Sequence, residues 1–440
     1  RLRPAKNKRE EISNMKLRAS LLSMLFGAAF VAAPIAWSRD LPIAAPEEAG
    51  MSSERLARIG AWLKSEVDKK KIPGAVVLVA RQGKVVYHEA LGVRDPGTGA
   101  PMTKDSIFRI YSMTKPIATV AAMSLVEEGR LMLEAPVAAY IPAFKDMKVA
   151  VERPDPAGGK PTVEMVPARR PITVQDLMRH TSGLTYGFFG RSAAKQAYID
   201  ANISAEGDIT NAEFAERIAA MPLGFQPGST WDYSYSTDVL GRVVEVAGGK
   251  SLGEVLRERI FDPLQMGDTA FYVTDPARQT RVAEPFPDDR MIGTGVSFND
   301  PRIARKAEPA GQGLTGTAMD YARFAQALLN GGELDGKRII GPATLAYMTS
   351  DHLGSSIAKG NLYLPGAGYG FGLGFAVRTA AGESAYPSSV GEYYWGGAGG
   401  TYFWADPKQD MLVVFMMQSP KNRVPYRSLL RNMVYASIVK

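Results

Sequence analysis

The sequence contains no cysteine among its 440 residues and only three histidines. The lack of cysteine excludes disulfides, thiolate catalysis, Cys-ligated zinc and a lipid-anchored cysteine. His88, His180 and His352 lie far apart, without His-x-His or His-Glu-x-x-His spacing. The sequence therefore predicts no histidine-built metal site, and we expect neither a metal nor another cofactor. No Gly-x-Ser-x-Gly elbow is present either, so the chain does not support a Ser-His-Asp triad.

An excess of charge of one sign is also lacking over most of the chain. The formal net charge is +7, but residues 1–38 hold seven basic and two acidic residues. The rest of the chain therefore carries a net charge of only +2. A charge this small gives no electrostatic reason to expect a nucleic-acid partner.

A long apolar run occurs at residues 19–37, directly after the basic segment that begins at Met15. This pattern predicts a secretory signal peptide over about Met15 to Ser38, with cleavage after Ser38. A retained membrane anchor is the alternative, but the run is barely long enough to span a bilayer and Pro34 interrupts it. We therefore expect an exported protein, periplasmic or secreted, without stable membrane anchoring after cleavage.

Ser112 and Lys115 lie three residues apart in front of the apolar segment 117–126. Pro116 predicts the first turn of a helix there, which places both side chains on one face. A serine hydroxyl needs a neighbour to take its proton, and a desolvated lysine can do so. The pair is therefore a candidate nucleophile with an activating amine.

The Ser-x-x-Lys spacing alone is weak support, because it also occurs at Ser192/Lys195 and Ser356/Lys359. Both of these pairs lie among polar, Gly- and Ala-rich residues. We predict a solvated loop or an exposed helix face for each of them.

Two further stretches carry chemistry. In residues 227–241 (PGSTWDYSYSTDVLG), Tyr233 follows a turn and precedes a helix. A tyrosine beside a lysine ammonium can relay protons, although a packing role for the ring is the alternative.

Residues 393–400 (YYWGGAGG) are rich in glycine. Glycines let backbone N–H groups approach a substrate closely, as an oxyanion hole requires. A bulge or tight turn is the alternative.

The hydrophobic patterns predict strands near both chain ends and mostly helices between them. The expected elements are a helix from residue 52 or 53, a hairpin at 75–80 and 84–89, a Gly/Pro loop at 92–103, mainly helices joined by loops over 134–285, a helix at 317–330, strands at 372–378, 401–405 and 411–418, and a helix at 426–438. Within the middle region, Thr173 and Ser251 are predicted helix N-caps. This order suggests one antiparallel sheet built from both ends around an inserted helical part.

Taken together, the motifs resemble the serine β-lactamase and penicillin-binding protein superfamily. The likeness is greatest to class C β-lactamases and to family VIII carboxylesterases. It rests on the Ser-x-x-Lys pair, HTSGL at 180–184, PGSTWDYS at 227–234, GLTGTAMDYARFAQALLNGG at 313–332 and WGG at 395–397. The resemblance implies an α+β, β-lactamase/transpeptidase-like fold: an antiparallel sheet built from both chain ends and flanked by helices, with an inserted mainly α-helical domain. The corresponding domains are a leader at 1–38, a sheet domain at 39–133 and 286–440, and a helical domain at 134–285.

The resemblance also implies roles for individual residues. Ser112 is the expected nucleophile that forms an acyl-enzyme, and Lys115 is expected to help deprotonate it. Tyr233 is expected to act as, or share, the general base and then to protonate the leaving alcohol. The backbone N–H groups of Ser112 and Ala398 are expected to form the oxyanion hole. Which of Lys115 and Tyr233 holds the proton stays open.

Two departures from the lactamase pattern bear on the substrate. Trp395 stands where lactamases keep the lysine of Lys-Thr-Gly, so a cation for a β-lactam carboxylate is missing. Tyr235 stands where they keep the asparagine of Tyr-x-Asn. Both differences favour uncharged esters, and we expect Trp395, Gly396, Gly397, Tyr235 and Tyr111 to contact the substrate.

The leading hypothesis is therefore a serine carboxylesterase that cleaves small, short-chain esters through a Ser112 acyl-enzyme. The first alternative is a class C-type β-lactamase or a D-amino-acid peptidase. The second alternative is a non-catalytic binding or scaffold protein of the same fold. The expected partner is a small-molecule ester, and the sequence leaves the oligomeric state open.

Overall fold

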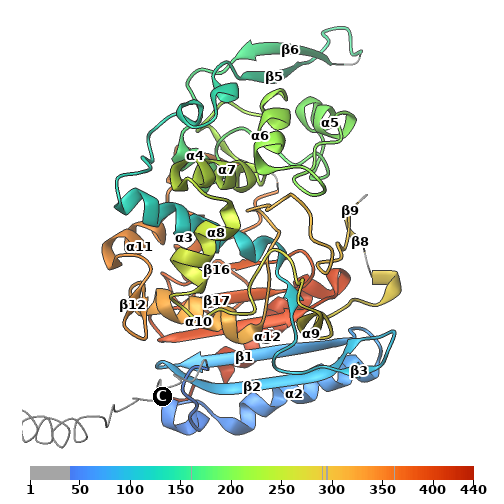
Figure 1. Ribbon diagram of the computed structural model, residues 1–440, viewed down its shortest axis with the longest axis vertical. Coiled ribbons are helices and arrows are strands. Elements are labelled where there is room, and N and C mark those ends of the chain that lie inside the picture. The colour runs from blue at the N-terminus through green and yellow to red at the C-terminus, as the bar shows by residue number, and fades with distance from the viewer. Residues whose placement is uncertain (1–39, 160, 290, 294–295, 361) are drawn as a thin grey trace, which may run out of the picture. The chain divides into compact units, whose positions relative to one another are not determined.

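An antiparallel sheet of eight strands is the central element of the chain (Figure 1). The computed structural model describes residues 40–440 except 160, 290, 294–295 and 361, so the predicted signal peptide lies outside the described residues. The strand order is β14-β15-β16-β17-β18-β1-β2-β3. The strands are β1 (Gly74–Arg81), β2 (Lys84–Asp95), β3 (Ala100–Pro101), β14 (Tyr369–Phe371), β15 (Ala376–Arg378), β16 (Tyr393–Gly396), β17 (Tyr402–Asp406) and β18 (Met411–Met417).

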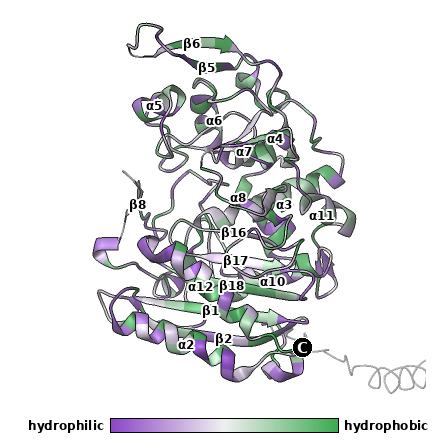
Figure 2. Ribbon diagram, turned by 180° about the vertical axis from the view of Figure 1, so that it is seen from behind, coloured by the Kyte–Doolittle hydropathy of each residue, from purple (hydrophilic) through white to green (hydrophobic). Residues whose placement is uncertain are grey.

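The two ends of the chain meet in the middle of this sheet, where β1 pairs with β18 from Ala75↔Met417 to Arg81↔Met411. Both strands are buried along their whole length. They read as nearly continuous apolar runs, which is the pattern expected of strands covered on both faces. Figure 2 shows this hydrophobic band along β18. The structure thereby confirms a sheet built from both chain ends.

Helices cover both faces of the sheet: α2 (Ser53–Asp68) and α12 (Arg423–Ala436) on one face, and α10 (Ala318–Leu329) on the other. Alternate residues of β17 point to opposite helices, as the two-residue period of a strand requires. Phe403 packs against Tyr321 of α10, with ring centroids 4.8 Å apart. Its neighbour Trp404 packs against Tyr435 of α12.

The remaining helices lie mainly beyond the α10 face of the sheet (Figure 1). They are α3 (Thr114–Glu127), α4 (Val174–Met178), α5 (Ala193–Asp200), α6 (Asn211–Ala219), α7 (Ser236–Gly248), α8 (Leu252–Leu256), α9 (Pro276–Gln279) and α11 (Pro342–Met348). Helix α7 packs against α3, α4, α6 and α8, so it is central to the helical part. The short 3-10 turns are η1 (Pro46–Ala49), η2 (Tyr111–Met113), η3 (Val137–Ala139), η4 (Pro142–Phe144), η6 (Pro287–Asp289) and η7 (Pro420–Asn422), and η5 (Arg257–Phe261) is a π-helical turn.

Short strand pairs complete the fold. They are β4 (Phe108–Arg109) with β10 (Thr315–Gly316), β5 (Lys148–Arg153) with β6 (Thr162–Pro167), β7 (Thr230–Trp231) with β13 (Ala358–Lys359), β8 (Met291–Gly293) with β9 (Val296–Ser297), and β11 (Glu333–Leu334) with β12 (Lys337–Arg338). None of the helices in the described part of the chain is long and apolar enough to cross a membrane.

The local sequence signals located most helix starts. The side chains of Ser52, Thr173 and Ser251 cap α2, α4 and α8, as predicted, and Thr317 caps α10 at the predicted start of that helix. Residues 40–440 form one compact unit, and the predicted domain boundaries at 134 and 285 stay a prediction.

Three predictions about strands were wrong. The predicted loop at 92–103 contains the end of β2 and all of β3. The strand predicted at 372–378 is a strand only over its last three residues, β15, because residues 372–375 form the turn from β14, where Gly374 has a φ of 87°. The β5–β6 hairpin was missed because its Pro- and Gly-rich turn was taken for a loop between helices.

Candidate active site

Ser112 lies in the short turn η2 at the amino end of α3. Pro116 falls in the first turn of α3, which agrees with the predicted helix start. Two hydrogen bonds hold this segment against the strand that follows Gly311. Ile110 N donates to Leu314 O at 3.0 Å, and Leu314 N donates to the Thr114 hydroxyl at 3.1 Å. Helix α3 is buried on nearly all sides, whereas Ser112 is partly exposed at its rim.

Tyr111 turns the chain immediately before Ser112. Its φ of 46° lies in the left-handed region, which is uncommon for a residue with a side chain and costs of order 1 kcal/mol. The ring is buried against Phe298, with centroids 5.4 Å apart, and against Gly399, where an added Cβ would lie 2.7 Å from a ring carbon. Tyr111 also lines a cavity of about 230 Å³. Gln312 and Gly313 form part of the same wall, and Ser112 is not among the lining residues.

Lys115 is 1% exposed, and its ammonium group is surrounded by acceptors. Nζ donates to Gly311 O at 2.7 Å, to the Tyr186 hydroxyl at 3.2 Å and to Ser112 Oγ at 3.5 Å. The face of the Tyr233 ring lies 4.6 Å from Nζ, within the range of a cation–π contact. The structure thus brings Ser112, Lys115 and Tyr233 together.

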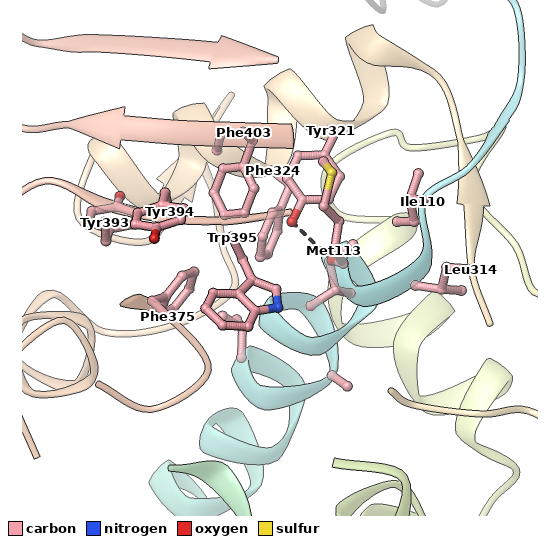
Figure 3. Close-up of a cluster of buried hydrophobic side chains, with 14 of the residues drawn as sticks. Ile110, Met113, Leu314, Tyr321, Phe324, Phe375, Tyr393, Tyr394, Trp395 and Phe403 are labelled. Carbon is pink, nitrogen blue, oxygen red and sulfur yellow. Dashed lines mark hydrogen bonds between the residues drawn. The ribbon is translucent and has the colours of Figure 1, made fainter. Parts of the chain in front are cut away.

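Trp395 joins this group through its indole. Trp395 Nε1 donates to the Tyr233 hydroxyl at 3.2 Å, and the two rings lie 5.4 Å apart. Figure 3 shows Trp395 beside the first turn of α3, next to the apolar side chains between the sheet and α10. In the same view, the Tyr321 hydroxyl donates to Met113 O at 3.0 Å and so fixes the backbone next to Ser112.

The glycine-rich turn after β16 presses against the backbone just before Ser112. An added Cβ at Gly397 would lie 2.4 Å from Ile110 O, and the Thr401 hydroxyl donates to the same oxygen at 3.1 Å. Gly397 N donates to Thr401 O at 2.8 Å, whereas Ala398 N donates to no described backbone or side-chain acceptor. The turn therefore packs against the backbone just before Ser112, and the oxyanion-hole role of the Ala398 N–H stays a prediction.

Tyr235 is not part of this group. Its hydroxyl donates to Ile203 O at 2.9 Å, and its ring is buried against Tyr186 and Phe214. It approaches Lys115 only through Tyr186, so its predicted contact with substrate stays a prediction.

Sequence reasoning did not predict the contacts that Tyr186, Gly311 and Asp238 make around Lys115. Tyr186 comes two residues after the HTSGL motif, and burial raises its pKa well above the usual value, so the phenol is neutral. Asp238 lies on the first turn of α7, five residues after Tyr233. Burial raises the pKa of Asp238 to about 6, although Lys115 acts in the opposite direction. The only sequence signal for Tyr186 and Asp238 was their position, since each is a polar residue shortly after a recognised motif.

His180 is buried next to Tyr233, with ring centroids 4.9 Å apart. Burial, assisted by the Lys115 charge, lowers the pKa of His180 well below its usual value. Its Nδ1 lies 3.3 Å from the Ser234 hydroxyl. His180 is therefore a neutral packing partner of Tyr233. Within the described residues, no group of three His, Asp or Glu side chains is arranged to hold a metal ion.

The Ser192/Lys195 and Ser356/Lys359 pairs differ from each other. Ser356 and Lys359 are exposed, as predicted. The exposed helix face predicted for Lys195 is wrong, because this residue is 7% exposed. Lys195 Nζ donates to Phe189 O at 2.5 Å and pairs with Asp232 at 3.4 Å.

Comparisons with known proteins agree with this arrangement. Residues 59–436 match the family model described as Beta-lactamase. The uncharacterized protein MT1414 of Mycobacterium tuberculosis is 35% identical over 365 residues, which cover 81% of this chain and 88% of that protein. Esterase EstB of Burkholderia gladioli is 32% identical over 403 residues, or 86% of this chain and 95% of EstB. The solved structure of EstCE1, a hydrolase with promiscuous acyltransferase activity, has a TM-score of 0.70 and 28% identity, covering 87% of this chain and 99% of EstCE1.

Proposed function

This chain belongs to the β-lactamase family of serine hydrolases, and from that premise we propose that it is a carboxylesterase acting on small, uncharged, short-chain esters. The observation that carries the proposal is the convergence of Ser112 Oγ and the Tyr233 ring on the buried Nζ of Lys115. A nucleophile, a cation and a proton-relaying phenol are the groups that acyl transfer through serine needs.

In the proposed reaction, Ser112 Oγ attacks the ester carbonyl carbon and its proton passes to the unit formed by Lys115 and Tyr233. The carbonyl oxygen becomes an oxyanion that accepts from the N–H groups of Ser112 and Ala398. The carbon–oxygen bond to the leaving alcohol then breaks, and the same unit returns a proton to that alcohol. Water attacks the acyl-enzyme in the same way, which releases the carboxylic acid and restores the Ser112 hydroxyl.

Trp395 supports an ester rather than a β-lactam substrate. It supplies no cation for a substrate carboxylate, and its one N–H already donates to Tyr233. The cavity lined by Tyr111, the residue before Ser112, measures about 230 Å³ and is compatible with a small acyl or alcohol group. The relatedness to esterase EstB points the same way.

We also propose that the enzyme is exported. This part of the proposal rests on the basic start and apolar run of residues 15–38. An exported esterase would meet small-molecule esters from outside the cytoplasm.

The first test compares initial rates on p-nitrophenyl butyrate and nitrocefin. Ser112→Ala should lower ester hydrolysis by at least about 10³-fold, because the nucleophile is lost. Ser192→Ala is the matched control: it removes a serine of the same motif spacing and should leave the rate within about twofold, as expected for a surface change away from the site. The wild type should turn over nitrocefin poorly.

Efficient, Ser112-dependent nitrocefin turnover would instead identify a β-lactamase. Hydrolysis of neither substrate, together with no labelling of Ser112 by a fluorophosphonate, would identify a non-catalytic member of the fold. Ester hydrolysis that survives Ser112→Ala would contradict the assigned nucleophile.

A further inference from the structure

A buried carboxylate that the proposed reaction does not use lies close to Lys115. Asp238 is 2% exposed, on the first turn of α7. Its Oδ1 accepts from Gly311 N at 2.9 Å, while its Oδ2 is buried without a hydrogen-bond partner among the described residues. A buried carboxylate oxygen without a partner is costly, so a nearby charge is needed to stabilise the ionised form.

Gly311 connects this carboxylate to Lys115. The carbonyl of Gly311 accepts the shortest of the hydrogen bonds from Lys115 Nζ, at 2.7 Å. The N–H of the same residue donates to Asp238. A Cβ at this position would lie 2.3 Å from Asp238 Oδ2, so only glycine permits the contact. Asp238 therefore fixes Gly311, and Gly311 fixes Lys115.

We propose that Asp238 is a positioning residue for the reaction proposed above, and this inference rests on that function. Its carboxylate orients the Gly311 carbonyl and supplies a counter-charge to the Lys115 ammonium, which acts as a positioned cation and not as the proton acceptor. The Ser112 proton passes to the Tyr233 oxygen as the Oγ–carbon bond forms, and Tyr233 returns it to the leaving alcohol as the carbon–oxygen bond breaks.

The surroundings of Tyr233 agree with its role as the group that takes and returns the proton. The Lys115 ammonium faces the Tyr233 ring, and Trp395 Nε1–H points at its oxygen. Both groups stabilise negative charge on the phenolic oxygen. As an ammonium ion, Lys115 would direct its three hydrogens at Gly311, Tyr186 and Ser112 and would have no lone pair with which to accept a proton.

The charge of Asp238 depends on pH. The titratable groups that face it are Lys115 from α3, Glu206 from the loop before α6, and the phenols of Tyr186 and Tyr235. Burial raises the pKa of Asp238 to about 6, against the opposing effects of Lys115 and the Gly311 N–H. Above pH 6 the counter-charge is therefore present, and below pH 6 it is lost by protonation.

The test is Asp238→Asn, which keeps the shape and the Oδ1 acceptor but removes the charge. We would measure kcat/KM for p-nitrophenyl butyrate from pH 5 to 9 for the wild type and the variant. At pH 8 the variant should be roughly 10- to 100-fold slower, because the Lys115 ammonium has lost its counter-charge. The difference should shrink toward one below pH 6, where the wild-type carboxyl is also neutral.

Asp406→Asn is the control. Asp406 is fully buried on β17, where it accepts from Tyr435 and Ser389 and does not face Lys115. Its replacement should change stability without changing the shape of the pH profile.

A loss by the same factor at every pH, or no loss at all, would overturn the inference. If Asp238→Asn fails to fold, Gly311→Ala takes its place, because the added Cβ forces the carboxylate and the loop apart. Wild-type activity in that variant would also overturn the inference. Absence of Ser112-dependent hydrolysis in the wild type would instead overturn the proposed function, and this inference with it.

Discussion

Two serine–lysine pairs of identical spacing begin helices in this chain, and both lysines are buried. The Lys115 ammonium is held by the Gly311 carbonyl and the Tyr186 hydroxyl, and it reaches Ser112 Oγ. The Lys195 ammonium is instead ion-paired with the Asp232 carboxylate. The serines differ too. Ser192 Oγ caps α5 by accepting from Lys195 N, whereas the Ser112 side chain caps nothing.

The comparison shows that spacing and burial together do not make a reactive pair. A lysine in direct contact with a carboxylate is a fixed structural charge, and a serine that caps a helix already has its oxygen engaged. In the Ser112 pair, Asp238 acts on Lys115 through an intervening glycine, so the ammonium still reaches the hydroxyl. Four variants test this difference between the two pairs.

The largest effect should come from exchanging the two lysines for methionine, one at a time. Lys115→Met should lower kcat on p-nitrophenyl butyrate by about 10³-fold or more, because the charge and proton-transfer unit are lost. Lys195→Met should change kcat by only a few-fold, because Lys195 contacts neither Ser112 nor Tyr233 in the structure. Steady-state kinetics of both variants would check this. Similar losses in the two would contradict the assignment of Lys115.

Lys195→Met should instead lower the free energy of unfolding by about 3 kcal/mol, since it leaves the Asp232 carboxylate buried without its cation. Burial already raises the pKa of Asp232, with Lys195 acting against it. Without Lys195 the carboxyl takes up a proton more readily in the folded state than in the unfolded state. The loss of unfolding free energy should therefore be larger at pH 8 than at pH 5. Urea unfolding of the wild type and the variant at both pH values would measure it.

The control for that experiment is the double variant Lys195→Met/Asp232→Asn. It should recover part of the lost stability, because no unpaired charge remains. A destabilisation of Lys195→Met that does not change with pH would argue against the ion pair.

The smallest effect is expected for Ser192→Ala. The variant should lose about 1 kcal/mol of stability, the usual contribution of a side-chain helix cap, with no change in ester hydrolysis. Thermal unfolding alongside kinetics would measure both. Loss of activity without loss of stability would give Ser192 a role that its capping bond does not explain.

Much of the fold could be predicted because its signals are local. Helix caps such as Thr173 and Ser251, and the apolar runs of β1 and β18, carry their information within a few residues. Strand ends and hairpin turns were less predictable. The strands at 148–153 and 162–167 pair with each other across a Pro- and Gly-rich segment and expose Val163 and Met165, so no buried apolar run marks them in the sequence.

The site was predictable only as far as its motifs extend. Ser112, Lys115 and Tyr233 stand in recognisable stretches, and the structure brings all three together. Gly311 and Asp238 could not be found, because their meaning depends on a contact between segments 73 residues apart. The burial of Lys195 was missed for the same reason: its partner Asp232 is distant in sequence.

The pairing of β1 with β18 has a consequence for how the chain folds. The strand that begins the sheet cannot be flanked on both sides until the last strand of the chain is available. Such a long closure costs considerable entropy, which slows assembly and leaves one edge of β1 unpaired in a partly synthesised chain, where β2 is its only partner. The backbone beside the nucleophile is held by Thr401, which lies between β16 and β17. Reactivity should therefore appear only at the end of folding, after the carboxyl-terminal strands have docked.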